Sequence, residues 1–334
     1  MEFRFTDDQI ALRDHVKAFL DGAHSTDCLR RLDSFGGRDP AIWRELQELG
    51  LCGLLVPEAQ GGLGLGLIEG ALLVVELGRG NVSEPIVDTA FVAAPWLARR
   101  GGHADLLVRI AAGEARVALA HQVNPWIADL DVAAAVISHS EAHTPPSALE
   151  RLHSVDPLRR LFARGPLGGD DPLLFDLAAL ASAAQLIGAA ERMLEMTAAY
   201  ARTREQFGQP IGAFQAIKHH CANVAVAIEF ARPALWRAAF AAEHSHALAP
   251  THISAAKLAA GDAALLAAET AIQVHGAMGY TYEVDLHYWM KRSWALIGAW
   301  GDRAFHLRRL DDAVLGGAID LGPGATFNSE YKSA

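Results

Sequence analysis

The sequence predicts a mainly α-helical protein in which two helical regions flank a short β-containing segment. Three observations support this fold class: helix-capping residues ahead of apolar runs near the N-terminus, long alanine-rich amphipathic runs in the second half, and short apolar runs separated by prolines between them. The chain has 334 residues, of which 51% are hydrophobic and 20% are charged, so it can bury a large core. This composition excludes intrinsic disorder and small disulfide-stabilised scaffolds.

The first helical region begins with a clear capping sequence. Thr6 and Gln9 stand three residues apart and form a capping box, which predicts a helix over about 6–21. An Asp-Pro start and a glycine end predict another helix over 39–50. The apolar run at 67–80 is long and rich in Leu, Ala and Glu, which favours a helix over a strand.

The pattern changes between Glu114 and Gly168. Two runs of small and β-branched residues, at 115–122 and 132–138, are typical of short buried strands. An Asn-Pro break follows the first run and a Thr-Pro-Pro break follows the second. We therefore expect a small β-containing insert in this part of the chain.

Long alanine-rich helices return from about Leu173 onward. One of them carries apolar residues at alternating steps of four and three: Ile217, Cys221, Val224, Ile228, Ala231 and Leu235. Such helices pack as an antiparallel four-helix bundle. The predicted organisation is an N-terminal helical domain (1–112), a truncated β-containing middle segment (113–170), a C-terminal helical bundle domain (171–322) and a tail (323–334).

Charge, cysteines and termini restrict the partners and the compartment. The formal net charge of −10 argues against a nucleic-acid partner. The three cysteines, at 28, 52 and 221, form no CxxC pair, which argues against a disulfide framework or a zinc site and favours the cytoplasm. No signal peptide and no uninterrupted apolar run of membrane-spanning length is recognised, so we expect neither export nor a membrane partner.

Several common site motifs are missing from the sequence. The glycine cluster at 61–70 resembles a dinucleotide-binding fingerprint, but its third glycine falls one position late and no βαβ unit surrounds it. The histidines lack the HExxH spacing, and there is no GxSxG or P-loop motif. No metal site is predicted.

Two segments have a combination of residues that a helix end and a glycine-rich loop do not explain. They are Tyr200–Gly212, followed by Phe214 and Gln215, and Ala271–Tyr280. In both, the sequence resembles the acyl-CoA dehydrogenase family, which uses FAD to desaturate acyl-CoA thioesters. Residues 43–64 resemble the N-terminal helical domain of that family.

The resemblance implies a set of residues that bind FAD. Arg204 and Phe207 would reach the FAD of a neighbouring subunit, Arg204 through the pyrophosphate, and Gln215 would help to hold it. Gln273 and Gly276 would line the adenine end from across the dimer. Guanidinium groups pair with phosphate oxygens in a bidentate manner, and glycine allows close approach of the backbone to a planar ring.

The chain departs from the family pattern at the catalytic base. The family takes the α-proton of the substrate with a carboxylate. The two positions at which members carry that residue read Trp300 and Ala178 here, so no catalytic base is assigned. Asp176 and Asp302 are close enough in sequence to substitute for it. In addition, the insert at 114–168 is too short for the family's β-barrel-like middle domain.

These departures suggest a subunit that completes the site of another chain. The resemblance then implies the base-lacking subunit of a heteromeric, steroid-type acyl-CoA dehydrogenase, in a heterotetramer active in lipid metabolism and steroid degradation. Its expected partners are an acyl-CoA substrate, a homologous base-bearing subunit and an electron-transfer acceptor protein. Two alternatives remain: a self-sufficient homo-oligomer that uses Asp176, Asp302 or another carboxylate, and a non-catalytic scaffold of the same fold.

Overall fold

The computed structural model describes residues 4–319, and the predicted tail at 323–334 lies outside them. The N-terminal part of the chain, up to Ala111, is helical. Its helices are α1 (Asp7–Ala23), α2 (Thr26–Ser34), α3 (Pro40–Glu48), α4 (Leu67–Arg79), the π-helix η3 (Val87–Ala93), α5 (Ala94–Arg100) and α6 (Ala104–Ala111), with 3₁₀ turns η1 (Leu51–Gly53) and η2 (Glu58–Gln60).

The predicted start of the first helix is confirmed at atomic level. The Thr6 hydroxyl accepts the Gln9 backbone N–H at 3.2 Å, and the Gln9 side-chain oxygen accepts the Thr6 N–H at 2.9 Å. Asp39 caps α3 by accepting the Ala41 N–H at 2.9 Å. The sequence analysis missed α2, which Ser25 caps at its start.

The middle segment forms two small sheets of short strands. The strands are β1 (Val117–Leu119), β2 (Trp126–Ala128), β3 (Ala135–Ser138), β4 (Glu141–His143), β5 (Arg151–Leu152) and β6 (Leu161–Ala163), with a 3₁₀ turn η4 (Leu130–Val132). One sheet has the order β1-β3-β4, in which β1 and β3 run parallel, and the other has the antiparallel order β2-β6-β5. The runs at 115–122 and 132–138 therefore contain strands as predicted.

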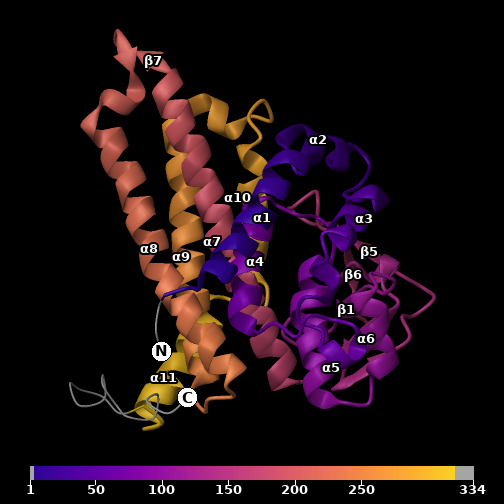
Figure 1. Cartoon of the computed structure of the whole chain (residues 1–334). Coiled ribbons are helices and arrows are strands. Elements are labelled where there is room, and N and C mark those ends of the chain that lie inside the picture. The colour runs from indigo at the N-terminus through magenta and orange to yellow at the C-terminus, as the bar shows by residue number, and fades with distance from the viewer. Residues whose placement is uncertain (1–3, 320–334) are drawn as a thin grey trace.

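Long helices dominate the second half. The elements are α7 (Pro172–Thr203), the hairpin β7 (Glu205–Gln206) and β8 (Gln209–Pro210), η5 (Ile211–Ala213), α8 (Gln215–Glu243), α9 (Ala249–His275), η6 (Gly276–Tyr280), α10 (Leu286–Gly298) and α11 (Arg303–Leu315). Helices α7, α8 and α9 pack alongside one another in antiparallel succession (Figure 1), and α10 packs on α7 and α9. The predicted mainly helical class with a C-terminal bundle is confirmed.

Helix α7 forms the centre of the core. It is long and apolar enough to cross a membrane by length and composition alone, but 83% of its most apolar window is buried inside the protein. It also crosses α4 at very short range: a Cβ added at Gly188 would lie 1.9 Å from the Val75 carbonyl oxygen. A Cβ added at Gly78 would lie 2.4 Å from the Gln185 oxygen. Two glycines thus let the backbones of α4 and α7 touch.

A buried ion pair connects the three parts of the chain. Asp156, in the middle segment, is fully buried and pairs with Arg292 on α10, which is 5% exposed. The Arg292 guanidinium also donates to the Val82 carbonyl oxygen, at 3.0 Å, in the loop after α4. One side chain therefore ties the N-terminal helices, the middle segment and the bundle together.

Candidate functional site

The structure brings the five predicted FAD-binding residues to one end of the bundle. Helices α7 and α9 end there and α8 begins there, because the three run antiparallel (Figure 1, at the hairpin that carries β7). Arg204 follows α7, Phe207 lies at the hairpin turn and Gln215 opens α8. Gln273 is in the last turn of α9 and Gly276 follows it.

Local contacts fix this end of the bundle. The ring of Tyr200 on α7 stacks on His275 of α9 with centroids 4.2 Å apart. The Ile211 N–H donates to the Arg204 carbonyl oxygen at 2.8 Å, which folds the hairpin back onto α7. Gly212 lies against the same helix, since an added Cβ would be 2.9 Å from the Ala201 oxygen. Arg204 and Phe207 are therefore held on a braced hairpin.

The predicted FAD-binding side chains at this end of the bundle are exposed to solvent. Arg204 makes no ion pair among the described residues, which removes the alternative that it serves a neighbour on its own helix. Phe207 is 92% exposed, and the Gln215 and Gln273 residues are exposed too. Gly276 has φ +60° with open space where a side chain would be.

This arrangement fits one half of a nucleotide site. An exposed, unpaired guanidinium suits a phosphate, and an exposed aromatic ring suits a planar ring system. Phe207 meets Phe214 edge to face with centroids 6.1 Å apart, and Arg204 and Phe207 both stay exposed. That a second polypeptide supplies the other half of the site is a prediction. The individual contacts to FAD stay predictions.

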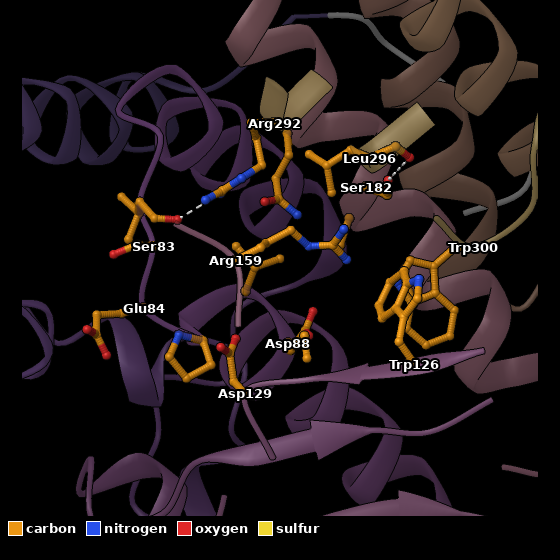
Figure 2. A pocket seen from close by; sticks show the side chains of 17 residues that line it. Ser83, Glu84, Asp88, Trp126, Asp129, Arg159, Ser182, Arg292, Leu296 and Trp300 are labelled. Atoms are coloured by element: carbon orange, nitrogen blue, oxygen red, sulfur yellow. Dashed lines mark hydrogen bonds between the residues drawn. The ribbon is translucent and has the colours of Figure 1, made fainter. Parts of the chain in front are cut away.

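A second site is a cavity of about 50 Å³ between the three parts of the chain. Its walls come from the loop after α4 with η3, from the middle segment, and from α7 and α10 (Figure 2). Ala178 and Trp300 both line it. The two positions that the sequence analysis predicts to correspond to the family's base thus converge on one cavity, and neither carries a carboxylate.

Hydrogen bonds hold Trp300 in place. Trp300 has φ +55° in the loop between α10 and α11, and its backbone N–H donates to the Asn124 side-chain oxygen at 3.1 Å. Its carbonyl oxygen lies 2.9 Å from Nε2 of His306, and Nδ1 of that ring lies 3.1 Å from the Ser254 hydroxyl. Since a carbonyl can only accept, the His306 Nε2 carries the hydrogen. Burial lowers the pKa of His306 to about 4, so the ring is neutral.

The two aspartates that could substitute for the missing base, Asp176 and Asp302, lie outside this cavity. Asp176 accepts a hydrogen bond from Arg309 at 2.9 Å, and burial raises its pKa. Asp302 caps α11 by accepting the Phe305 N–H at 2.8 Å. Neither is among the described residues that line the cavity beside Ala178 and Trp300.

Sequence reasoning missed the charged groups in this cavity. Figure 2 shows Asp88 and Arg159 near its middle and Trp126 beside Trp300 at one side. Burial raises the pKa of Asp88 to about 6, an effect that the positive charge of Arg159 partly opposes. The Arg159 guanidinium lies 4.3 Å from the centre of the Trp126 ring, and burial lowers its pKa to about 10. The one available indication was a lone acid inside the apolar run of residues 85–94.

Comparisons with known proteins agree with the geometry. Residues 6–114 match the family description "Acyl-CoA dehydrogenase, N-terminal domain", and residues 174–315 match "Acyl-CoA dehydrogenase, C-terminal domain". Acyl-CoA dehydrogenase IpdE2 of Mycobacterium tuberculosis is 38% identical over 288 residues, which are 83% of this chain and 88% of that protein. IpdE2 of Mycolicibacterium smegmatis is 33% identical over 315 residues, 91% of this chain and 97% of that protein.

Solved structures also resemble this chain. A chain of the ChsE4-ChsE5 complex from Mycobacterium tuberculosis superposes with a TM-score of 0.83 at 26% identity, covering 94% of this chain and 99% of that one. A chain of the Tcur3481-Tcur3483 steroid acyl-CoA dehydrogenase variant gives the same four values. The resemblance inferred from the sequence is confirmed. The chain belongs to the acyl-CoA dehydrogenase family, whose cofactor is FAD.

Proposed function

We propose that this chain is the base-lacking subunit of a heteromeric acyl-CoA dehydrogenase. It contributes Arg204, Phe207 and Gln215 to the FAD site of a neighbouring subunit, and Gln273 and Gly276 from across the dimer. The homologous partner supplies the carboxylate. The reaction forms a Cα=Cβ double bond in an acyl-CoA: the α-proton goes to the partner's carboxylate, and the β-hydride with its electron pair goes to FAD.

The convergence of Ala178 and Trp300 on one small cavity is the observation that carries this proposal. A methyl group and an indole cannot accept a proton. The cavity of about 50 Å³ is also far below the roughly 300–1,000 Å³ of common small-molecule sites. This chain's own pocket therefore has no carboxylate at the two predicted base positions and no room for an acyl group, whereas the residues predicted to form the FAD rim are exposed.

The relatives support a heteromer and a bulky substrate. One similar structure is a complex of two differently named chains, and another is described as a steroid acyl-CoA dehydrogenase. We extend both features to this protein as proposals: a heterotetramer, an acyl-CoA with a steroid side chain as substrate, an electron-transfer protein as acceptor, and the cytoplasm as compartment.

Flavin stoichiometry tests the proposal. The chain is expressed alone and together with a base-bearing homologue, and FAD per polypeptide is measured by absorbance after purification. We expect little FAD in the chain alone and one FAD per pair of unlike chains in the complex. Substrate should bleach that flavin under anaerobic conditions. A yellow, active protein made from this chain alone would contradict the proposal, and a complex without flavin would favour the scaffold alternative.

One observation favours a second candidate, a self-sufficient enzyme that uses Asp88 as its base. Asp88 lines the cavity next to the family's base positions and makes no ion pair or side-chain hydrogen bond among the described residues. Its raised pKa of about 6 would suit proton transfer near neutral pH. Asp88→Asn separates the two candidates, with Asp176→Asn as the matched control. The second candidate predicts that the chain expressed alone bleaches its flavin and that only Asp88→Asn abolishes this bleaching. Our proposal predicts that the chain alone holds little flavin and that both variants keep the bleaching of the co-expressed complex.

A further inference from the structure

A cleft of about 370 Å³ lies apart from both sites described above. It is enclosed by α1 and the residues just before it, by α4, by α7 and by α8. The residues that the argument uses are Phe5, Arg13, Glu76, Glu191, Arg232 and Trp236. Its volume falls within the usual range for small-molecule sites, so the chemistry of its walls indicates what it can hold.

Glu76 is the unusual group in this cleft. It lies on α4, is 5% exposed, and its Oε2 has no hydrogen-bond partner among the described residues. A buried acceptor that lacks a donor is unfavourable, so a ligand that brings a donor to Glu76 would be stabilised by that contact. Burial, and then the negative charge of Glu191, raise the pKa of Glu76 to about 7.

The other charges that line the cleft are already paired. Arg232 bonds Glu191 at 2.9 Å and also pairs with Glu229. Arg13 pairs with Asp14 at 2.7 Å. When it is ionised, Glu76 is thus the one lining charge without a partner among the described residues. A ligand that completes this site should carry a single positive charge and at least one N–H donor.

Two aromatic rings add a preference for cations. Phe5 and Trp236 meet edge to face, with centroids 5.2 Å apart and ring planes at 89°. The face of an indole ring attracts cations electrostatically, more strongly where water is excluded. Leu72, Val75 and Pro233 complete an apolar wall that would accommodate a carbon skeleton.

We propose that this cleft binds a small organic ammonium ion, with the Glu76 carboxylate as counter-ion and the Phe5–Trp236 pair as its aromatic wall. The carboxylate accepts the ammonium hydrogens, and the apolar part of the ligand lies on the rings. This site is independent of the proposed FAD and acyl-CoA chemistry.

The proposal predicts a defined pH dependence. Ammonium binding requires ionised Glu76, so affinity should rise by about tenfold from pH 6 to pH 8 as Glu76 loses its proton. The charged groups that act on Glu76 from the surrounding helices are Arg13 and Lys17 of α1, Arg79 of α4, Glu191 of α7, and Arg232 with Glu229 of α8.

Calorimetric titration of the purified protein with benzylammonium chloride tests the site, in whichever assembly it is isolated. We expect saturable binding of one ion per chain and a loss of at least about tenfold in affinity for Glu76→Gln. Gln matches the shape of the protonated Glu, so this variant should fold, and thermal unfolding checks it. Trp236→Leu should also weaken binding. Glu114→Gln changes an exposed carboxylate that does not line the cleft, so it should leave binding unchanged.

Benzyl alcohol serves as the neutral probe of equal size. The proposal is overturned if benzyl alcohol binds as tightly as benzylammonium, or if Glu76→Gln binds benzylammonium with unchanged affinity. It is also overturned if benzylammonium shows no saturable binding up to about 10 mM, roughly ten times a Kd of 1 mM. FAD content is measured in parallel. Because Glu76 is outside the predicted FAD rim, its variants should keep the flavin even where ammonium binding fails.

Discussion

Arg204 is the residue on which the cofactor assignment most depends. Its guanidinium is exposed, unpaired among the described residues, and held by a braced hairpin. In the co-expressed complex, Arg204→Gln should weaken FAD binding by about 10–100-fold, the worth of one or two charge-assisted hydrogen bonds. Equilibrium dialysis of the flavin measures this change.

Arg202 provides the control for Arg204. It is an exposed arginine in the last turn of α7, the helix that Arg204 follows. Arg202→Gln removes the same charge two residues away, so equal losses in both variants would point to a general electrostatic effect and not to a phosphate contact at Arg204.

Two buried histidines should make the fold sensitive to acid. His24 and His306 are 5% and 1% exposed, and burial lowers the pKa of each from 6.5 to about 4. Below pH 6.5 these two histidines take up protons in the unfolded chain, whereas in the folded chain they stay neutral down to about pH 4. Stability is therefore complete above pH 6.5 and falls as the pH drops toward 4, by on the order of 3 kcal/mol for each histidine.

Urea unfolding at pH values from 7.5 to 4.5 measures this effect. His306→Asn should lower stability at neutral pH, because the Trp300 carbonyl loses its donor, and should flatten the acid slope. An unchanged slope would mean that His306 takes up its proton in the folded state.

At the level of single residues, sequence reasoning located apolar positions better than acids. Trp300 was predicted from its spacing after residues 290–292 and Ala178 from its place near the start of the first long C-terminal helix, and the structure places both in one cavity. Asp88 belongs to no motif and follows apolar neighbours, so only the fold reveals that it faces Arg159. Its position in a π-helix, where the backbone widens, leaves no mark in the sequence.

The crossing of α4 and α7 is the tightest contact between elements, and it predicts a sharp response to one methyl group. Gly188→Ala would put Cβ at 1.9 Å from the Val75 oxygen, a backbone atom that cannot move without shifting α4. We expect a loss of at least about 1–3 kcal/mol in the free energy of unfolding.

Gly22→Ala is the matched control for this contact. Gly22 lies in α1, is exposed, and has nothing within 4 Å of an added Cβ. The same substitution there should stabilise the protein by about 0.5–1 kcal/mol, because alanine is the better helix former. If both variants changed the free energy of unfolding by the same amount and in the same direction, the crossing of α4 and α7 would not be the cause.

The long helices were predictable from the sequence, whereas the shortest strands were not. Residues 224, 228, 231 and 235 of the predicted series in α8 are buried, so its period correctly gave the inner face. Strand β5 has only two residues, Arg151 and Leu152, and exists because they pair with Phe162 and Leu161. These pairs join residues eleven and nine positions apart and depend on the tertiary fold, and two residues are too few to show an alternating pattern.

The whole molecule depends on the buried Asp156–Arg292 pair, because it is where all three parts meet. Asp156 also accepts the Leu158 N–H at 3.0 Å, and Arg292 reaches the loop after α4 through Val82. Removing one partner of a buried pair leaves an uncompensated charge and costs about 3–5 kcal/mol. We therefore expect Asp156→Ala to lower the urea midpoint strongly, with the protein concentration and partner held fixed.

An exposed pair shows whether burial is the cause. Arg303 and Asp262 are 60% and 55% exposed, with the closest atoms 3.1 Å apart, and such pairs contribute about 0–1 kcal/mol. Asp262→Ala should therefore leave the midpoint nearly unchanged. If Asp156→Ala had an equally small effect, the three parts would be held together mainly by their apolar contacts. If it instead split the transition into two steps, Asp156 would be the residue that makes the middle segment unfold together with the bundle.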